Sequence, residues 1–431
     1  MYVIPHVQCG GRGYDRHVYI EDGRDEGRKN LSGLFQITKL LANASVNRKE
    51  PYPASLRDVL NEKMADEAGA VIKSWPGYGE TPLISLDGLA RAVGVKKVWY
   101  KDESARFGLR SFKALGGAYA VLRILLDMLI AEGEKVDINE RDIFSSERLR
   151  NLARTVTVTC ATDGNHGRSV AWGCQMLGCR CVIYLHEGVS MERQKAIESF
   201  GAEIVRCKGN YDDSVRHAAQ DAATYNRIVV SDTSYPGYTD IPKYVMAGYT
   251  VMSGEIIDRI GPELSHVFVQ GGVGGLAAAL LAHFWMAFGN QRPHFLVIEP
   301  DKADCLYQSA LAGAPAVVHG MLDTIMAGLA CGEPSHLAWA ILAQGADSFA
   351  TIPDAGVPDA MRLLARSPYG DPKIEAGESA VAGLAFLLAA ASRPEIVRSL
   401  GLDQNAEILV IGSEGATDPI LYQRIIAGQI A

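Results

Sequence analysis

From residue 114 onward, the sequence alternates between short apolar runs rich in β-branched residues and longer segments with helical periodicity. The first series predicts helices over 116–132, 168–177, 190–200 and 212–225, and strands over 155–160, 181–185, 202–207 and 227–231. The second series predicts strands over 265–270, 294–299 and 407–412, and a helix over 275–288. Alternation of this kind is typical of βαβ units around a parallel sheet. We therefore predict an α/β protein with two parallel-sheet domains and a cleft between them.

The length of the chain also favours more than one domain. Its 431 residues, 48% of them hydrophobic, exceed what one ordinary core accommodates. We expect an irregular N-terminal extension over 1–50, a large domain from 51–115 and 230–431, and a small domain over 116–229. Ligands of open α/β sheets bind where the strands end. The predicted site therefore combines three loops that leave strand ends: 161–167, 271–275 and 413–418.

Composition excludes several classes of protein. The net charge is −8 and no basic stripe is interleaved with aromatic residues, so we expect no nucleic-acid partner. The eight cysteines form no Cys-x-x-Cys pair, which argues against a structural zinc site and favours a reducing compartment. The first thirty residues lack the apolar core of a signal peptide. The most apolar long helix, 276–288, is short and carries His283, so we expect a soluble cytoplasmic protein.

A phosphate-binding loop is predicted directly after the strand 265–270. Residues 271–275 contain four glycines and precede a helix, whose N-terminus offers N–H donors and a partial positive charge. The same loop also fits the G-x-G-x-x-A pattern of nicotinamide enzymes, with Glu299 at the end of the next strand. A tight turn with glycines required for packing is the plainer explanation, and the loop alone does not separate these three readings.

Lys113 is the candidate nucleophile. It stands between Phe112 and Ala114 at the start of a predicted helix, with two glycines shortly after it. A lysine in an apolar, cation-bearing pocket loses its proton more readily and forms Schiff bases. A single lysine at a helix start is usually only solvated, but this one occurs together with a phosphate loop and a carboxylate loop.

The carboxylate loop is the segment CATDGNHGRSVAW, residues 160–172. Asp163 lies between a predicted strand and a predicted helix, at a turn whose free N–H groups favour anions. A carboxylate at a turn that favours anionic ligands would compete with such a ligand, so we ask what function Asp163 has. An Asx turn or a helix N-cap remains the structural alternative for Asp163.

Three of these motifs resemble the fold-type II pyridoxal-phosphate enzymes, the relatives of serine/threonine dehydratases and tryptophan synthase β. Ser111-Phe-Lys113, Gly164-Asn-His-Gly167 and the loop 271–275 occur here in the same order as in that family. Longer segments, such as KDESARFGLRSFKALGGAYA, SDTSYPGYTDIP and IMAGLACGEP, resemble the 2,3-diaminopropionate ammonia-lyases. The resemblance covers roughly residues 78–420. It implies pyridoxal 5′-phosphate as the cofactor, in the cleft and bound mainly by the large domain.

The resemblance implies a role for each matching residue. Lys113 would hold the cofactor as a Schiff base, next to Phe112, and Asn165 would bond its 3′-oxygen. The loop backbone would bind its phosphate, through Gly271, Gly272, Val273, Gly274 and Gly275. Ser413 would set a hydroxyl against the pyridine nitrogen, where the ammonia-lyases tend to have threonine. A hydroxyl does not force that nitrogen to be protonated, which suits elimination.

The resemblance also gives Asp163 its task. Ordinary dehydratases have a small neutral residue there, whereas diaminopropionate carries a second amine that a carboxylate would attract. Asp163 would also act as a general base opposite Lys113 and as a proton donor to ammonia, and Asp232 would supply a second acid. We expect the substrate to contact the loop residues as well: Thr162, Gly164 and His166, the last as a hydrogen-bonding member of the turn.

The implied reaction is elimination from 2,3-diaminopropionate, from both enantiomers if each face has a base, to pyruvate and two molecules of ammonia. The partner would be a small amino acid, with no metal, and the family implies a homodimer. Three alternatives remain open: a dehydratase of serine, threonine or another β-substituted amino acid, a nicotinamide dehydrogenase, and a catalytically silent relative. Cys305 and Cys331 match cysteines of the family and are expected to be buried thiols, with a disulfide the less favoured state.

Overall fold

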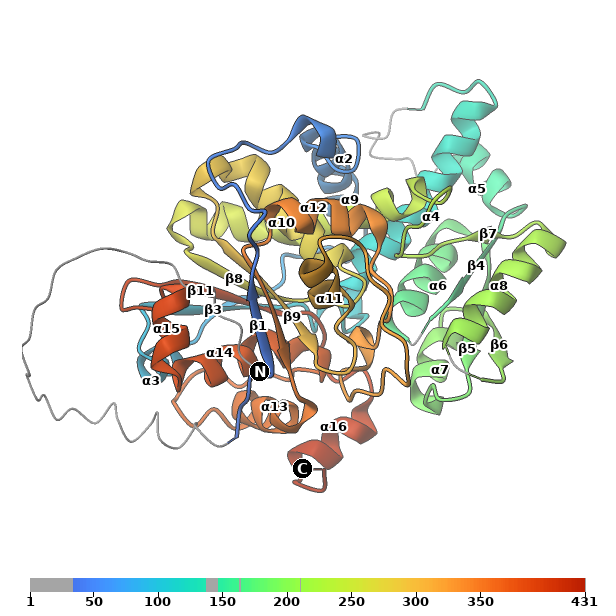
Figure 1. Cartoon of the computed structure of the whole chain (residues 1–431). Helices are drawn as coiled ribbons and strands as arrows, with labels where there is room; N and C mark the ends of the chain where they lie inside the picture. Colours follow the sequence, from blue (N-terminus) through green and yellow to red (C-terminus); the bar gives the residue numbers. More distant parts are fainter. Residues whose placement is uncertain (1–33, 137–145, 163, 210, 431) are drawn as a thin grey trace, which may run out of the picture.

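The computed structural model describes residues 34–136, 146–162, 164–209 and 211–430 of the chain, and these ranges form two sheets with covering helices (Figure 1). The larger sheet has seven strands in the order β1-β10-β9-β8-β11-β3-β2. The strands of this sheet are β1 (Lys39–Ala42), β2 (Leu83–Ser85), β3 (Lys97–Asp102), β8 (His266–Gln270), β9 (His294–Pro300), β10 (Ser348–Ile352) and β11 (Glu407–Gly412). The five central strands are parallel, and β1 and β2 close the two edges antiparallel.

Both faces of this sheet are buried, as expected for parallel strands covered by helices. Along β8, Val267 and Val269 face one core, and Phe268 faces the other. Figure 1 shows three helices over the first face: α9 (Asp240–Ile260), α10 (Gly275–Phe288) and α12 (His336–Gly345). The second face is covered by α3 (Asp87–Val93), α13 (Val357–Arg366), α14 (Ala382–Ala391) and α15 (Pro394–Leu400).

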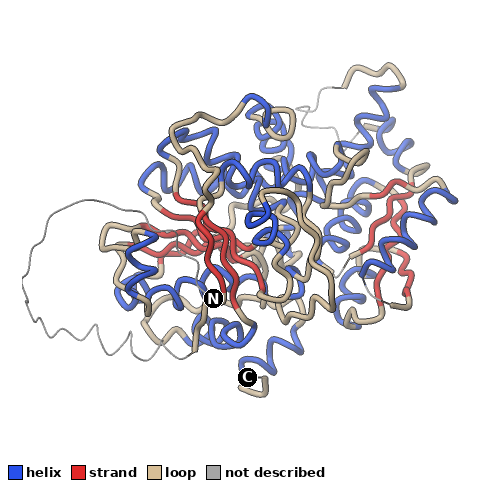
Figure 2. Tube along the Cα trace, viewed as in Figure 1, coloured by secondary structure: helices blue, strands red, loops and turns tan. Residues whose placement is uncertain are grey.

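The smaller sheet is entirely parallel, in the order β6-β5-β4-β7. It is built from β4 (Thr157–Ala161), β5 (Arg180–His186), β6 (Glu203–Cys207) and β7 (Ile228–Val229). The helices among and beside these strands are α5 (Glu147–Ala153), α6 (Asn165–Leu177), α7 (Met191–Glu198) and α8 (Tyr211–Tyr225). Figure 2 shows the two sheets as separate groups of strands, each with helices packed around it. The α/β class with parallel-sheet domains is confirmed.

Helix α4 (Lys113–Ala131) runs between α6 and α9. It is long and apolar enough to cross a membrane, but 72% of its most apolar window lies inside the protein, which is typical of a core helix. Helix α4 corresponds to the helix predicted over 116–132. The remaining helices are α2 (Glu62–Lys73), α11 (Cys305–Ala312) and α16 (Pro419–Ile426).

One sequence expectation needs correction. The extension over 1–50 is not irregular throughout, because β1 lies in it and pairs with β10. Helix α2 begins at Glu62, where the Asn61 side chain accepts a hydrogen bond from the N–H of Met64. Residues 1–33 lie outside the described part of the chain.

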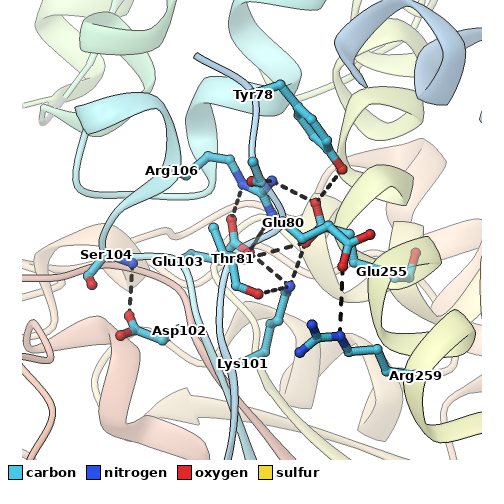
Figure 3. A network of polar contacts seen from close by, with 12 residues as sticks. Tyr78, Glu80, Thr81, Lys101, Asp102, Glu103, Ser104, Arg106, Glu255 and Arg259 are labelled. Carbon is cyan, nitrogen blue, oxygen red and sulfur yellow. Dashed lines mark hydrogen bonds and ion pairs between the residues drawn. The ribbon is translucent and has the colours of Figure 1, made fainter. Parts of the chain in front are cut away.

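A buried network of charges fixes the segment that leads from β3 to Lys113 (Figure 3). Lys101 is the penultimate residue of β3, Glu103 and Arg106 follow the strand, and Glu255 comes from α9; each is at most 1% exposed. Arg106 donates to Glu103 at 2.8 Å and to Glu255 at 2.7 Å, and Lys101 donates to Glu255 at 2.5 Å. The two acids therefore compensate the two bases, as buried charges require.

The same segment is also attached to the end of β11. The N–H of Glu103 donates to the carbonyl of Gly412 at 2.8 Å, and the N–H of Phe112 donates to the carbonyl of Ser413 at 3.0 Å. The segment leaves and rejoins the sheet at fixed points, so the network determines where α4 begins. Lys113 is the first residue of that helix.

We expect Glu255→Gln to destabilise the protein by about 3 kcal/mol or more, because it leaves an excess positive charge in a buried network. Urea unfolding of the purified protein measures this. The matched control is Arg216→Gln at the exposed pair with Asp213, which should change stability by about 1 kcal/mol or less. Equal effects at both positions would contradict the assignment of Glu255 to a buried charge network.

Candidate active site

A single cavity collects most of the residues that the sequence analysis singled out. It lies at strand ends of both sheets and encloses about 990 Å³ of space, part of which is open to solvent. The predicted residues that line it are Phe112, Lys113, Thr162, Gly164, Asn165, His166, Asp232, Gly271, Gly272, Val273, Gly275 and Ser413. Gly274 belongs to the loop but is not part of the lining. Asp163 lies outside the described residues.

The loop 271–275 has the geometry of an anion-binding turn. Gly272 and Gly274 have φ angles of +66° and +95°, which side chains rarely tolerate, and α10 begins at Gly275. The N–H of Gly271 donates to the carbonyl of Ile298, and this bond anchors the loop to β9. The N-terminus of a 14-residue helix thus faces the cavity, where its N–H groups and dipole favour a phosphate.

Glu299 does not serve the loop as a ribose-binding acid. Its side chain is fully buried beneath the loop, so close that a Cβ on Gly271 would lie 2.7 Å from its Cγ. It accepts hydrogen bonds from the N–H groups of Leu306 and Tyr307 at 2.9 and 2.7 Å, and burial raises its pKa to about 8. Glu299 therefore supports the first turn of α11, and the nicotinamide interpretation loses the residue on which it depended.

Lys113 and Asp232 form an ion pair in the lining of the cavity. The Lys113 Nζ lies 2.5 Å from Asp232 Oδ2, and it is 5.2 and 5.8 Å from the ring centres of Phe112 and Tyr249. Burial disfavours the charge on Lys113, but the attraction of Asp232 outweighs it and raises the pKa of the amine. Burial likewise opposes the charge on Asp232, and Lys113 holds the pKa of that carboxyl well below its usual range.

This pairing corrects the expectation of a readily deprotonated lysine. No cation adjoins Lys113 among the described contacts; an acid does, and its effect on the pKa has the opposite sign. Lys113 is therefore a charged amine held at a defined position. Its proton has an acceptor, Asp232, within hydrogen-bond distance.

His166 is a buried, hydrogen-bonded member of the turn. Its Nε2 lies 2.8 Å from the carbonyl of Val230, and its Nδ1 is 3.9 Å from Asp232 Oδ2. Burial lowers the pKa of the imidazole, although the nearby Asp232 opposes this effect. A neutral ring therefore stands beside the Lys113–Asp232 pair, and it links α6 to the segment that carries Asp232.

The start of α6 is tied to the larger sheet. The Asn165 Nδ2 donates to Glu414 at 2.5 Å, and Ser169 Oγ donates to the carbonyl of Lys113 at 2.6 Å. The hydroxyl of Thr162 accepts hydrogen bonds from the N–H groups of Gly164 and Gly167, and so ties the end of β4 to the start of α6. These bonds join the cavity loops of the two sheets.

Ser413 is buried directly after β11, and its hydroxyl lies 2.7 Å from the Nε2 of Gln270. Sequence reasoning missed Gln270 and several other lining residues: Arg193, Tyr211, Tyr249, Ser379 and Glu414. Two of them carried a signal, since Gln270 directly precedes the glycine loop and Glu414 directly follows Ser413. Tyr249 lies in the middle of α9, which no local pattern connected with the site.

The two cysteines singled out in the sequence are both free thiols. Cys305 is buried at the start of α11, as expected, whereas Cys331 is half-buried and lines the cavity. Burial raises the pKa of the Cys305 thiol. Cys305 and Cys331 are therefore not joined by a disulfide in this structure.

Comparison with known proteins defines the class. The sequence model of the family described as pyridoxal-phosphate dependent enzyme matches residues 74–410. The class is thus the fold-type II pyridoxal 5′-phosphate enzymes, and the nicotinamide alternative is wrong.

Comparison with individual proteins places the chain in a narrower family within this class. The diaminopropionate ammonia-lyase of Escherichia coli strain K12 is 42% identical over 358 residues, which are 81% of this chain and 88% of that protein. Two crystal structures of the Escherichia coli enzyme, one with D-serine and one with an aminoacrylate-PLP azomethine reaction intermediate, are each 37% identical and superpose with TM-scores of 0.83 and 0.82. Each covers 92% of this chain and 99% of its own. The chain belongs to the diaminopropionate ammonia-lyase family.

Replacing Asp232 by asparagine should lower the pKa of Lys113 by roughly 1–3 units, because it removes the attraction and leaves only the effect of burial. Only the neutral amine attacks an aldehyde, so the pH at which Lys113 reacts with pyridoxal phosphate should fall. Borohydride trapping of the cofactor-free protein across a pH series, with peptide mapping, measures it. Asp240→Asn, at an exposed pair with Lys243, is the control and should leave the profile unchanged. An unshifted profile in Asp232→Asn would contradict the pairing.

Proposed function

We propose that this enzyme eliminates ammonia from 2,3-diaminopropionate, with pyruvate and a second ammonia as final products. The observation that carries the proposal is the Lys113–Asp232 pair in a cavity bordered by a glycine phosphate loop. An amine, an acid and a phosphate cradle are the groups that a pyridoxal-phosphate lyase needs. The aminoacrylate intermediate seen in the Escherichia coli relative supports elimination as the reaction type.

The residues of the cavity suit the cofactor. The loop Gly271–Gly275 would bind its phosphate, Lys113 its aldehyde carbon, and Asn165 its 3′-oxygen. Ser413 would meet the ring nitrogen and Phe112 would border Lys113. When bound, pyridoxal phosphate supplies an electron sink that makes the Cα proton of an amino acid removable.

The carboxylates of Asp232 and Asp163 support a substrate that carries a second amine, as 2,3-diaminopropionate does. The carboxylate of Asp232 lines the cavity, and it would attract a cationic substrate group once Lys113 is bound to the cofactor. Asp163, which directly precedes the α6 turn in the sequence, would take or return protons at Cα and at the departing amine. Lys113 would take or return the Cα proton on the opposite face of the substrate. Backbone groups of Thr162, Gly164 and His166 would orient the substrate.

A dehydratase of serine is the second candidate, because the Escherichia coli relative was crystallised with D-serine. The hydroxyl of serine is neutral and gains nothing from two carboxylates. We therefore place diaminopropionate first and serine second as substrates.

Domain organisation and assembly form part of the same proposal. We propose a large cofactor domain formed by 51–115 and 230–431, now extended by β1, and a small domain over 116–229 that carries the substrate loop. A cytoplasmic homodimer is the form that the family resemblance and the free thiols support.

The direct test combines labelling and turnover. The purified holoenzyme should absorb near 410 nm, lose that band on borohydride reduction with Lys113 modified, and release pyruvate from diaminopropionate faster than from serine (about 410 nm is a property of the cofactor). Lys113→Ala should lose the band and at least about 10³-fold of turnover. Unmodified Lys113 in active enzyme would refute the assignment of the nucleophile, and faster turnover of serine would favour the dehydratase.

If Lys113 and Asp163 serve opposite faces, Asp163→Asn should reduce kcat for one enantiomer of diaminopropionate by about 10²-fold or more and affect the other far less. Steady-state pyruvate release from the separate D and L forms measures this. Asp240→Asn, an exposed carboxylate on α9, is the matched control and should leave both rates unchanged. Equal losses with both enantiomers would contradict the two-face arrangement.

A further inference from the structure

Gln270 ends β8, immediately before the phosphate loop, and is 2% exposed. Its Nε2 lies 3.0 Å from the carbonyl oxygen of Ile411, 3.1 Å from that of Ser379, and 2.7 Å from the hydroxyl of Ser413. Its Oε1 is buried and has no hydrogen-bond partner among the described residues. The amide group therefore directs only its NH₂ toward three oxygen atoms.

These contacts fix the orientation of the amide. Backbone carbonyls only accept hydrogen bonds, so the group that faces Ile411 and Ser379 must donate. The flipped amide would set Oε1 against two carbonyl oxygens without a proton between them. The hydrogen-bond network thus assigns nitrogen to this position.

The fixed amide determines what Ser413 can do. An amide nitrogen offers no accepting lone pair, so the Ser413 hydroxyl cannot donate to Gln270 and must accept from it. Two N–H groups are then shared among three acceptors, as in a three-centre hydrogen bond. The proton of the Ser413 hydroxyl is left for another acceptor, and Ser413 lines the cavity.

We propose that Gln270 is a positioning residue that makes Ser413 a hydrogen-bond donor toward the ring nitrogen of bound pyridoxal phosphate. A donor at that position stabilises the unprotonated nitrogen, and an unprotonated ring is a weaker electron sink that suits elimination. The inference rests on the placement of the cofactor proposed above and on no assumption about the substrate.

Removing the Gln270 amide has a defined consequence. In Gln270→Leu, the carbonyls of Ile411 and Ser379 each lose a hydrogen-bond donor, and the Ser413 hydroxyl loses the group that prevented it from turning away from the cavity. The effect of Gln270 on the cofactor should therefore pass through Ser413. A residue that only packed the core would not show this dependence.

The first experiment uses the unmodified holoenzyme. With cofactor labelled by ¹⁵N at the ring nitrogen, its NMR shift should be that of an unprotonated pyridine at neutral pH. A shift typical of pyridinium would overturn the proposal, even if every variant failed to fold.

The second experiment is a double-mutant cycle on the dissociation constant of pyridoxal phosphate, measured by spectral titration. Gln270→Leu and Ser413→Ala should each weaken binding about tenfold, and the double variant should bind no more weakly than Ser413→Ala. Gln344→Leu, at an exposed glutamine on α12, is the matched control and should bind normally. Additive losses, near a hundredfold in the double variant, would overturn the proposal.

The cycle also separates this inference from the proposed cofactor placement. If Ser413→Ala changes neither affinity nor the ¹⁵N shift, the placement of the ring nitrogen is wrong, and the inference fails with it. If Ser413→Ala has its effect and Gln270→Leu has none, only the role of Gln270 is refuted. Borohydride labelling of Lys113 in each variant confirms that the cofactor is bound at the same amine.

Discussion

The ion pair between Lys113 and Asp232 is the interaction on which the rest of this site depends. A buried ammonium or carboxylate alone is strongly unfavourable, so each group keeps its charge because the other is 2.5 Å away. The pair sets the pKa of both groups in opposite directions and gives the proton of the amine a nearby acceptor. His166 adds a neutral, hydrogen-bonded neighbour that holds α6 against the segment of Asp232.

The pair needs a rigid frame because its members come from distant parts of the chain. The network of Lys101, Glu103, Arg106 and Glu255 fixes the segment that ends at Lys113. Its ion pairs are supplemented by hydrogen bonds from Lys101 and Arg106 to Thr81. The contact of Asn165 with Glu414 joins α6 to the end of β11. The cavity is therefore held from both sheets, and its polar groups are oriented before any ligand enters.

Much of the fold could be predicted because its signals are local. The helix 275–288 and the strand 407–412 have the predicted bounds, since a glycine loop and a run of apolar residues mark them. Helix α9 had no such signal: a proline near its start and internal glycines obscure its periodicity, and burial stabilises it instead. The strand β1 is only four residues long and exists because β10 offers an unpaired edge.

The sequence by itself determined the class of enzyme and many of the residues that line its cavity. Lys113, Asn165, the glycine loop and Ser413 each stand in a local motif whose chemistry is legible without coordinates. Only the tertiary structure decided the charge state of Lys113, the burial of Glu299 away from the cavity, and the hydrogen-bond direction at Ser413. A pKa and a hydrogen-bond direction depend on atoms within a few ångströms, and in this fold those atoms come from residues more than a hundred positions away in the chain.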